Sequence, residues 1–420
     1  MNKRAFGTGL LSGCIICAFF FTVVSCGKLM KQSAETEEET TVSATTIDET
    51  QTVSAEDNSV ISDPIVQAKI RAIEETIHNL YIDDVTDEEL AEGLYDGIIG
   101  ALGDPYSVYY TKEEYSELMT DTEGVYYGIG AYLQMDTLYG YPRITGIIAN
   151  SPAEDSPLRV DDYITKVNGE DIYGIELSEA VKLIKGPENT EVTLTVVRQS
   201  DSSEFDVTLT RQKVETPTVT YEMKDEEIGY ISISQFDEVT VGQFAEALAA
   251  VKEEHAKGII LDLRGNPGGL VSAAVEIADM ILPAGNVVYT VDKYGTREDY
   301  PCSGQNELDI PMVVLVNGGS ASSTEILAGA IKDYGKGYLL GTTTFGKGIV
   351  QRMMQFKDGS GIKLTVSHYY TPLGNDIHKV GIEPDEVLEF DKDLYYTENL
   401  QDSVDNQLER ALEKIREMIQ

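Results

Sequence analysis

The chain has 420 residues, more than one hydrophobic core usually organises, so the sequence predicts more than one domain. Its formal charge of -40 at pH 7 comes from 72 Asp and Glu against 32 Lys and Arg. Such an acidic surface repels a phosphate backbone, which excludes nucleic acid as a natural partner.

The first 26 residues predict an export signal and are set apart from the fold. Lys3 and Arg4 precede a nearly uninterrupted apolar run from Leu10 to Val24, and Cys26 follows it. Residues 23–26, Val-Val-Ser-Cys, resemble a bacterial lipobox, in which the cysteine carries the lipid. An uncleaved signal anchor is the alternative, because the run is close to the length of a membrane helix. Either form attaches the chain to the extracytoplasmic face of the bacterial cell membrane, and the short run favours a lipoprotein.

An acidic linker is expected over residues 27–63. The segment is rich in Glu, Thr, Ser and Ala and lacks aromatic residues, so it cannot bury enough apolar surface to offset the entropy of ordering. We expect it to be disordered and to space the folded part from the membrane.

Cysteine and histidine usage argues against a disulfide or a metal in the folded part. Cys302 is the only cysteine after residue 26, so no intrachain disulfide can form there. Histidines with HExxH or other ligand spacing are lacking. The four histidines are His78, His255, His368 and His378. We therefore predict no metal and no cofactor.

Residues 64–120 predict a small helical region. Apolar residues at helical spacing continue from Pro64, which suits a first helical position, to Leu80. A second helix is expected from Asp87 to Leu102, because acids fill its first turn and Gly103-Asp104-Pro105 stops it. These helices, and a C-terminal helix within residues 393–420, are candidates for packing or dimer contacts. A homodimer and a monomer both agree with the sequence.

Residues 121–212 alternate short β-type runs with turns around one amphipathic helix from Leu177 to Ile184. The first predicted strand runs from Tyr126 to Leu133. The block resembles a PDZ domain. The resemblance rests on Tyr127-Gly128-Ile129-Gly130, Ser151-Pro152-Ala153, Asp162-Tyr163-Ile164, Val167-Asn168-Gly169 and Glu179-Ala180-Val181.

A PDZ domain adds an extended peptide to its sheet as a strand and captures the terminal carboxylate with backbone amides of a Gly-rich loop. By this resemblance, the peptide-binding loop comprises Tyr127, Gly128, Ile129 and Gly130. Alone, the same four residues also fit a plain β-turn with glycines at positive φ. Only the whole block of motifs favours the PDZ interpretation.

Beyond residue 213 the pattern becomes α/β, and it contains candidate catalytic groups. An apolar strand from Gly258 to Leu263 runs into the turn Arg264–Gly269, whose glycines can direct backbone N–H groups toward an oxyanion. A second apolar strand, Pro311–Val316, precedes a Ser-rich segment and a helix. A serine between a strand end and a helix start is expected to be exposed at the sheet edge, where it can attack a carbonyl. Ser320, Ser322 and Ser323 compete for this role, and Ser322 with Glu325 also fits a capping box.

The best candidate for a general base is a lysine. Lys347 stands between two glycines in an apolar, uncharged stretch, where close packing would desolvate its ammonium and lower its pKa. A neutral lysine can take the proton of a serine hydroxyl. The alternative is an ordinary exposed surface lysine.

Together these motifs resemble the C-terminal processing peptidases, also called tail-specific proteases, over roughly residues 64–390. The resemblance rests on the PDZ block and on Leu261-Asp262-Leu263-Arg264-Gly265-Asn266-Pro267-Gly268-Gly269, Gly319-Ser320-Ala321-Ser322 with Glu325-Ile326, Phe345-Gly346-Lys347-Gly348 with Gln351, Tyr369-Tyr370-Thr371-Pro372 and Gly381-Ile382-Glu383-Pro384-Asp385.

The resemblance implies a role for each matching residue. Ser322 is the nucleophile, Lys347 the general base and Gln351 the residue that orients it. The backbone amides of Gly268 and Ser323 form the oxyanion hole. The implied fold is α/β and multidomain. It joins the helical region, the PDZ domain and a β/α spiral peptidase core of the crotonase/Clp type over residues 213–392.

The expected function is that of a serine endopeptidase that cleaves extracytoplasmic proteins with apolar C-termini. A non-catalytic PDZ scaffold that binds peptides without turnover is the first alternative. A crotonase-like acyl-CoA enzyme is the second, although such an enzyme is not expected to carry a PDZ domain or an export signal. A third alternative keeps the protease but makes it latent until a peptide or partner moves the PDZ domain.

Overall fold

The computed structural model describes residues 45–46, 59–395 and 404–420. The predicted export signal and most of the acidic linker lie outside the described residues. Within these ranges, no helix combines the length and the apolar character needed to cross a bilayer.

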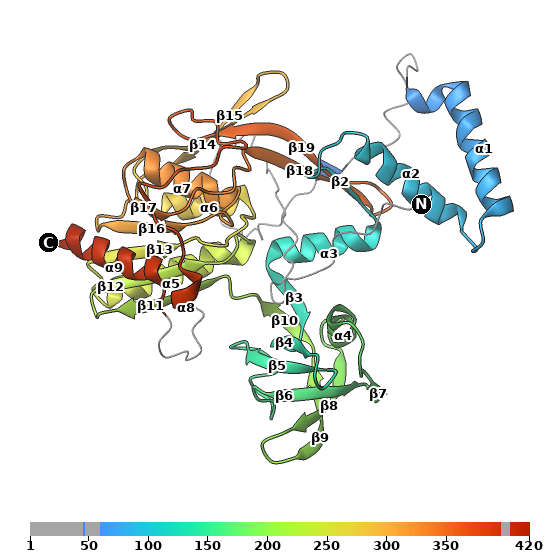
Figure 1. Cartoon of the computed structure of the whole chain (residues 1–420), viewed down its shortest axis with the longest axis horizontal. Coiled ribbons are helices and arrows are strands. Elements are labelled where there is room, and N and C mark those ends of the chain that lie inside the picture. The colour runs from blue at the N-terminus through green and yellow to red at the C-terminus, as the bar shows by residue number, and fades with distance from the viewer. Residues whose placement is uncertain (1–44, 47–58, 396–403) are drawn as a thin grey trace, which may run out of the picture.

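The two helices predicted for the N-terminal region are present. The side chain of Asp63 caps α1 (Pro64–Leu80), and Thr86 and Glu89 form a capping box at the start of α2 (Asp87–Gly100). The second helix ends two residues before its predicted end. Neither helix buries a residue, and both project from the body of the molecule in Figure 1.

A short strand and a third helix lead from this region toward the core. They are β2 (Val108–Tyr110) and α3 (Lys112–Glu123), and the sequence analysis did not predict α3. This helix buries Tyr115 and Leu118, which pack with Met353 in a small apolar cluster of their own. Two apolar residues on a mostly charged helix give a weak sequence signal, which is why α3 was missed.

The PDZ block forms a sheet in the order β4-β5-β6-β8-β9, with β7 paired to β6. Its helix α4 (Leu177–Ile184) has the predicted bounds. The block has its own apolar core, separate from that of the α/β part that follows it. Its strands are β4 (Ala131–Asp136), β5 (Tyr141–Ile147), β6 (Asp162–Val167), β7 (Glu170–Asp171), β8 (Glu191–Arg198) and β9 (Ser203–Thr210).

The single strand predicted from Tyr126 to Leu133 was wrong. The chain forms β3 (Val125–Gly128) and then β4, with a break at Gly130. Gly130 has a φ of +80°, and a Cβ at this position would lie 2.1 Å from the Cβ of Ser151. The positive φ and the close approach of Ser151 interrupt the strand at a position that only glycine can fill.

Two adjacent strands join the PDZ block to the core. The chain enters through β3 and returns through β10 (Gln212–Glu215), and these two strands pair with each other. Gly124 at the end of α3 has a φ of +70°, and a Cβ there would lie 2.7 Å from the Cβ of Asp237 in the core. The entry and exit of the PDZ block therefore lie side by side against the core, as Figure 1 shows.

The core is built on a sheet in the order β11-β12-β13-β16-β17-β20, in which β11 is antiparallel to β12 and the other pairs are parallel. Buried apolar side chains alternate between its two faces. On β13, Ile259 and Leu261 face one apolar cluster and Ile260 faces the other. The strands are β11 (Val219–Lys224), β12 (Ile228–Ile233), β13 (Gly258–Asp262), β16 (Met312–Val316), β17 (Tyr338–Gly341) and β20 (Glu386–Val387).

Helices cover both faces of this sheet. The larger cluster holds α5 (Glu238–Glu253), α6 (Val271–Asp279) and α7 (Ser323–Asp333), and the smaller one holds α9 (Asn406–Ile419), which follows the short α8 (Lys392–Tyr395). The apolar face of the C-terminal helix thus packs against the core of its own chain, where Ala411 and Ile415 are fully buried. That face is not available for the dimer contact considered from the sequence.

A second sheet, which the sequence analysis did not predict, crosses the helical face of the core. Its order is β1-β18-β19-β14-β15, with β2 also paired to β19. Strand β2 brings the N-terminal region to the core. The remaining members are β1 (Thr45–Thr46), β14 (Gly285–Asp292), β15 (Arg297–Cys302), β18 (Ile349–Gln355) and β19 (Gly361–Tyr370).

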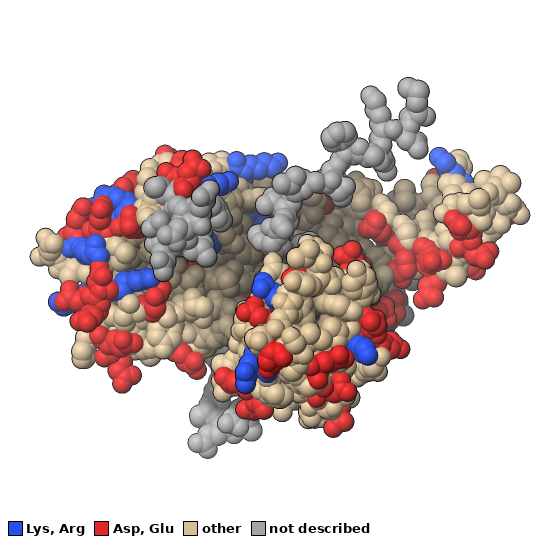
Figure 2. All heavy atoms as spheres, turned by 60° about the horizontal axis from the view of Figure 1, so that its bottom comes forward, with Lys and Arg blue, Asp and Glu red and all other residues tan. Residues whose placement is uncertain are grey.

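Acidic side chains are spread over the surface rather than gathered in one place. Figure 2 shows Asp and Glu on the core, on the PDZ block and on the N-terminal helices, with fewer Lys and Arg between them. On this face, the excess of negative charge is therefore shared by the core, the PDZ block and the N-terminal helices.

Candidate active site

Ser322 occupies the position between the end of β16 and the first residue of α7. Its backbone has φ +64° and ψ -116°, a conformation that a non-glycine residue holds only at a cost of about 1–3 kcal/mol. Its side chain is fully buried, and its Oγ makes no hydrogen bond within the described residues. The expectation of an exposed serine was wrong. Ser322 is the N-cap of α7 and its amide donates to Glu325 at 2.8 Å, as in the predicted capping box. Its hydroxyl, by contrast, is enclosed and makes no hydrogen bond, and a strained backbone with such a hydroxyl is typical of a functional site.

The two competing serines have structural partners. Ser320 Oγ donates to the carbonyl of Leu263 at 2.7 Å, and Ser323 Oγ donates to the carbonyl of Gly269 at 2.9 Å. Both hydroxyls therefore tie the start of α7 to the turn after β13. This leaves Ser322 as the serine whose hydroxyl is available for chemistry.

Glu325 holds the backbone around the serine. Its carboxylate is fully buried in the first turn of α7 and accepts four hydrogen bonds. The donors are the amides of Ser322, Gly346 and Lys347 and the hydroxyl of Thr344. Glu325 therefore fastens the start of α7 to the loop that carries the lysine.

Lys347 is 3% exposed, so the alternative of a surface lysine was wrong. The pKa of Lys347 is lowered from 10.5 to about 8, first by burial and then by the neighbouring ammonium of Lys363, while Asp104 and Glu325 oppose the shift. A substantial fraction of the lysine is therefore neutral near pH 8 and can accept a proton.

Gln351 lies on β18, four residues after the lysine. It is fully buried, and its Nε2 donates to the backbone carbonyl of Tyr106. Its Oε1 makes no hydrogen bond within the described residues. Since Ser322 Oγ also lacks a partner, the structure brings the serine, lysine and glutamine onto neighbouring elements without a hydrogen bond joining serine to lysine.

Gly268 packs directly against the serine. It has a φ of +101°, and a Cβ there would lie 2.7 Å from the carbonyl oxygen of Ala321 and 3.0 Å from the amide nitrogen of Ser323. The α-carbon of Gly268 thus lies next to the amide of Ser323, the other residue predicted for the oxyanion hole. The N–H of Gly268, however, donates to Oδ1 of Asn266 at 2.8 Å. An oxyanion at this position has to replace that bond.

The predicted peptide-binding loop lines a cavity of about 70 Å³ between β4 and α4. A larger cavity of about 370 Å³ in the same block is lined by other residues. Gly128, Ile129 and Gly130 line the smaller cavity, whereas Tyr127 does not and Tyr126 does. The cavity lies beside β4, which is an edge strand of its sheet and so leaves one side open to a further strand.

Comparison with known proteins identifies the chain. The family model of peptidase family S41 matches residues 227–388. That of the PDZ domain matches residues 143–198, and that of the activating protease CtpB N-terminal domain matches residues 21–114. A carboxyl-terminal-processing protease of Synechocystis is 39% identical over 296 residues, which cover 70% of this chain and 69% of that protein. The chain belongs to peptidase family S41. It is a carboxyl-terminal-processing serine protease with a PDZ domain.

This S41 peptidase is also similar to one further curated protein and to two solved structures. A probable CtpA-like serine protease of Staphylococcus aureus is 38% identical, over 77% of this chain and 65% of that protein. A solved photosystem II D1 C-terminal processing protease is 28% identical with a TM-score of 0.46, covering 80% of this chain and 94% of that chain. The PDZ domain of a carboxy-terminal protease from Vibrio cholerae, solved in complex with a peptide, is 36% identical with a TM-score of 0.20. The match covers 22% of this chain and 98% of that chain.

Family membership resolves the question of activity. The α/β multidomain fold with a PDZ domain and a peptidase core is confirmed, and so is the prediction of a serine peptidase. The non-catalytic scaffold and the acyl-CoA enzyme are both set aside, because the curated relatives are named as proteases.

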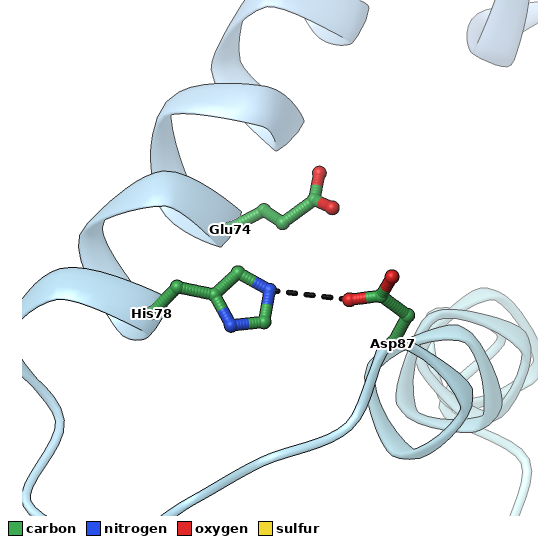
Figure 3. A group of neighbouring side chains, drawn as sticks. All are labelled: Glu74, His78 and Asp87. Atoms are coloured by element: carbon green, nitrogen blue, oxygen red, sulfur yellow. Dashed lines mark ion pairs between the residues drawn. The ribbon is translucent and has the colours of Figure 1, made fainter.

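Within the described residues of the peptidase, one group has side chains at metal-ligand distance, and it lies far along the chain from the serine. Glu74 and His78 of α1 and Asp87 of α2 place their ligand atoms within 4.8 Å of one another (Figure 3). His78 Nε2 lies 3.3 Å from Asp87 Oδ1. All three residues are exposed. The contact between His78 and Asp87 joins the two helices, and this structural role explains why the three side chains lie together.

One part of the site was missed in the sequence. The turn Asp104–Ser107 was interpreted only as the stop of a helix, yet the ring of Tyr106 lies 4.8 Å from Lys347 Nζ. Lys363 on β19 was also overlooked, although its ammonium is buried near Lys347. The sequence pointed to this part of the site only through the Gly103-Asp104-Pro105 motif, which by itself indicates a turn and no contact with the lysine.

Proposed function

We propose that this peptidase hydrolyses peptide bonds with a catalytic dyad of Ser322 and Lys347. The observation that carries the proposal is a strained, buried serine hydroxyl without a partner, fastened through Glu325 to a buried lysine whose pKa is lowered to about 8. A serine of ordinary reactivity needs a base, and a neutral lysine supplies one.

The chemistry is acyl transfer in two steps. Neutral Lys347 takes the proton of Ser322 Oγ as the oxygen attacks the peptide carbonyl, and the resulting oxyanion accepts hydrogen bonds from the amides of Gly268 and Ser323. The ammonium of Lys347 then protonates the leaving amine. In the second step Lys347 activates water, which releases the acyl group from Ser322. Gln351 Oε1, which has no hydrogen-bond partner in the described residues, accepts a hydrogen bond from Lys347 during the reaction in this proposal.

The PDZ domain selects the substrate in this proposal. The groove between β4 and α4 takes the last residues of a protein chain as an added strand, and Gly128, Ile129 and Gly130 offer backbone amides to the terminal carboxylate. Lys185 adds a positive charge beside this groove, with its Nζ 4.9 Å from the ring centroid of Tyr126. The small apolar lining favours proteins with apolar C-termini.

The decisive experiment compares single variants on an unstructured protein with an apolar C-terminus. Ser322→Ala and Lys347→Ala are each expected to abolish cleavage. Ser320→Ala is the serine control, since its hydroxyl has only structural bonds, and Lys293→Ala is the lysine control on an exposed hairpin. Full turnover by either dyad variant would rule the dyad out.

A resting, latent state is the second part of the proposal. It is supported by the hydrogen bond from Gly268 to Asn266 and by the missing bond between Ser322 Oγ and any base. Substrate must therefore rearrange the site before the chemistry begins. Rates measured with and without an added C-terminal peptide test this state, because a peptide that leaves the rate unchanged shows that the resting enzyme is already competent.

The cellular setting follows from the N-terminal sequence. We propose that the peptidase acts outside the cytoplasm and is held at the membrane through a lipid on Cys26 or through an uncleaved signal anchor. Mass spectrometry of the membrane-bound protein tests the two forms, since a lipidated Cys26 has to be the first residue of the mature chain. A chain that begins at Met1 supports the anchor instead.

A homodimer formed through the N-terminal helices completes the proposal. Neither α1 nor α2 buries a side chain, yet Ile65 is 78% exposed, Leu80 79% and Ile98 52%. Apolar faces of this kind favour contact with a partner. Sedimentation of the full chain and of Ile65→Asp tests the dimer, and equal masses for both proteins would count against it.

A further inference from the structure

The turn between α2 and β2 reaches the catalytic lysine and the glutamine behind it. The ring of Tyr106 lies 4.8 Å from Lys347 Nζ, and the carbonyl of the same residue accepts a hydrogen bond from Gln351 Nε2. One residue of the N-terminal region therefore contacts two residues of the proposed machinery from a distance of more than 200 positions in the sequence.

The turn is fixed to the sheet that carries the glutamine. Asp104 accepts hydrogen bonds from the hydroxyls of Ser107 and Thr365, both at 2.6 Å, and Ser107 Oγ accepts from the amide of Thr365 at 3.1 Å. Thr365 on β19 is the register partner of Gln351 on β18. The contact of Tyr106 with Gln351 is therefore held on both sides by the same pair of strands.

The carbonyl of Tyr106 determines how the glutamine amide is oriented. A carbonyl oxygen can only accept, so the group that meets it has to be the NH₂ of Gln351, and Oε1 has to occupy the other side. That oxygen is buried and has no hydrogen-bond partner in the described part of the chain. A buried acceptor left unpaired costs about 1–3 kcal/mol, so it is held ready for a donor that arrives during the reaction.

The charges around the lysine come from three elements. Lys363 on β19 lowers the pKa of Lys347, whereas Asp104 in the turn and Glu325 on α7 raise it, and burial is the largest cause of its low value. His378 also packs against the neighbouring Gly348, and its imidazole has a lowered pKa because of burial and His368. Burial raises the pKa of Asp104, but hydrogen bonds from Ser107 and Thr365 bring it below its ordinary value, so its charge persists at neutral pH.

We propose that the Asp104–Ser107 turn is a positioning element of the active site, in which the Tyr106 carbonyl aims Gln351 Oε1 and the Tyr106 ring and Asp104 carboxylate set the charge state of Lys347. The inference rests on the proposed dyad. Its consequence is that the N-terminal helical region takes part in the chemistry through a single turn, so that any displacement of α2 reaches the general base.

The pH dependence of kcat/KM tests the electrostatic part, with the full chain and an unstructured reporter protein as substrate. Activity rises with pH as Lys347 loses its proton. Asp104→Asn keeps the shape of the side chain and removes its charge, so the rising limb moves to lower pH by about one pH unit. Lys363→Met removes a positive neighbour and moves the limb to higher pH. Asp84→Asn, an exposed change of the same charge in the loop before α2, leaves it in place.

The opposite pH shifts expected for Asp104→Asn and Lys363→Met distinguish an effect on the pKa of Lys347 from a general loss of stability. A variant that merely loosens the fold lowers the rate without moving the limb in the direction of the removed charge. A limb that stays at the wild-type position in Asp104→Asn, while Lys363→Met moves it, overturns the proposed role of the turn. Equal unfolding transitions of the variants and wild type confirm that the comparison concerns the site alone.

Substitution of Tyr106 tests the role of its ring beside Lys347. Tyr106→Ala removes the ring and opens Lys347 to water, so we expect kcat to fall by about tenfold to a hundredfold and the rising limb to move to higher pH. Tyr106→Phe keeps the ring and the carbonyl and restores the wild-type limb. Loss of activity in both variants to the same degree, with an unmoved limb, contradicts the proposal.

Failure of this inference is distinguishable from failure of the dyad. If Ser322→Ala or Lys347→Ala retains activity, the dyad itself is wrong and the pH shifts lose their meaning. If both are inactive while Asp104→Asn and Tyr106→Ala match wild type in rate and in pH profile, the dyad stands and the turn has no role in it.

Discussion

A single carboxylate oxygen of Glu325 accepts hydrogen bonds from the backbone amides of Ser322 and Lys347, each at 2.8 Å. The same atom thus fixes both proposed catalytic residues, although 25 positions separate them in the sequence. Its other oxygen binds Gly346 and Thr344 in the lysine loop. The distance between the two catalytic backbones is therefore set by one side chain.

Glu325→Gln is expected to lower kcat by about a hundredfold and to destabilise the fold by about 2 kcal/mol or more, because the amide nitrogen cannot accept two of the four hydrogen bonds. Peptidase assays and chemical unfolding measure the two effects. Binding of a C-terminal peptide to the PDZ domain is the control, since it does not depend on Glu325. Wild-type turnover in this variant contradicts the linking role of the carboxylate.

Lys347→Met is expected to stabilise the protein while it removes activity. The pKa of Lys347 is lowered from 10.5 to about 8, so below pH 8 the fold contains a buried charge that the unfolded chain does not have to bury. The unfolded chain binds more protons between these values, so wild-type stability rises with pH there. At pH 7 the variant gains up to about 3 kcal/mol in the free energy of unfolding, and the gain shrinks toward pH 10.

Guanidinium unfolding at both pH values measures this gain, with Ser322→Ala as the background that removes self-cleavage. A gain of the same size at pH 7 and pH 10 would show that packing, rather than the buried charge, stabilises the variant.

Gly268→Ala is expected to abolish most activity, by about a hundredfold or more, since a Cβ there lies 2.7 Å from the carbonyl of Ala321 and 2.9 Å from the Cβ of Ser322. The matched control is Gly295→Ala, because Gly295 also has a positive φ of +80° but no atom within 4 Å of its Cβ position. Both variants bear the backbone strain of alanine, and only the first crowds the serine. Similar losses in both variants would assign the effect to strain alone.

Val181→Glu is expected to weaken the binding of C-terminal peptides by tenfold or more and to raise KM for substrates with an apolar C-terminus. Val181 on α4 lines the small PDZ cavity, so a glutamate there repels the peptide carboxylate and replaces an apolar contact. Leu183→Glu is the control two residues away, since Leu183 is exposed and lies outside the lining. Fluorescence anisotropy with a labelled peptide measures both, and equal weakening by the two variants places the groove elsewhere.

The parallel strands of the core could be predicted because both of their faces are buried. A continuous apolar run such as Pro311–Val316 is the direct consequence of a strand that packs against α7 on one side and α9 on the other. The position of Ser322 between the end of this run and the start of the next helix followed in the same way. The choice among three serines did not follow from the pattern and needed the resemblance to a family.

The environment of the site could not be predicted, because it is made of contacts between distant segments. Tyr106 meets Gln351 only because β2 adds to the edge of the second sheet, and no local pattern indicates that pairing. The burial of Ser322 has the same origin, since the hydroxyl of Tyr369 donates to its carbonyl from β19 at 3.0 Å. Local sequence patterns indicate which residues can react, whereas tertiary contacts determine which of them are enclosed.

The paired strands β3 and β10 connect two parts of the molecule that each have an apolar core of their own. The PDZ domain has its own apolar core and meets the peptidase through this narrow connection, so it can unfold and refold while the larger core stays intact. Ser322 and Lys347 belong to the larger core. A partial unfolding confined to the PDZ domain would therefore leave the proposed catalytic residues in place while it removes the proposed peptide-binding groove.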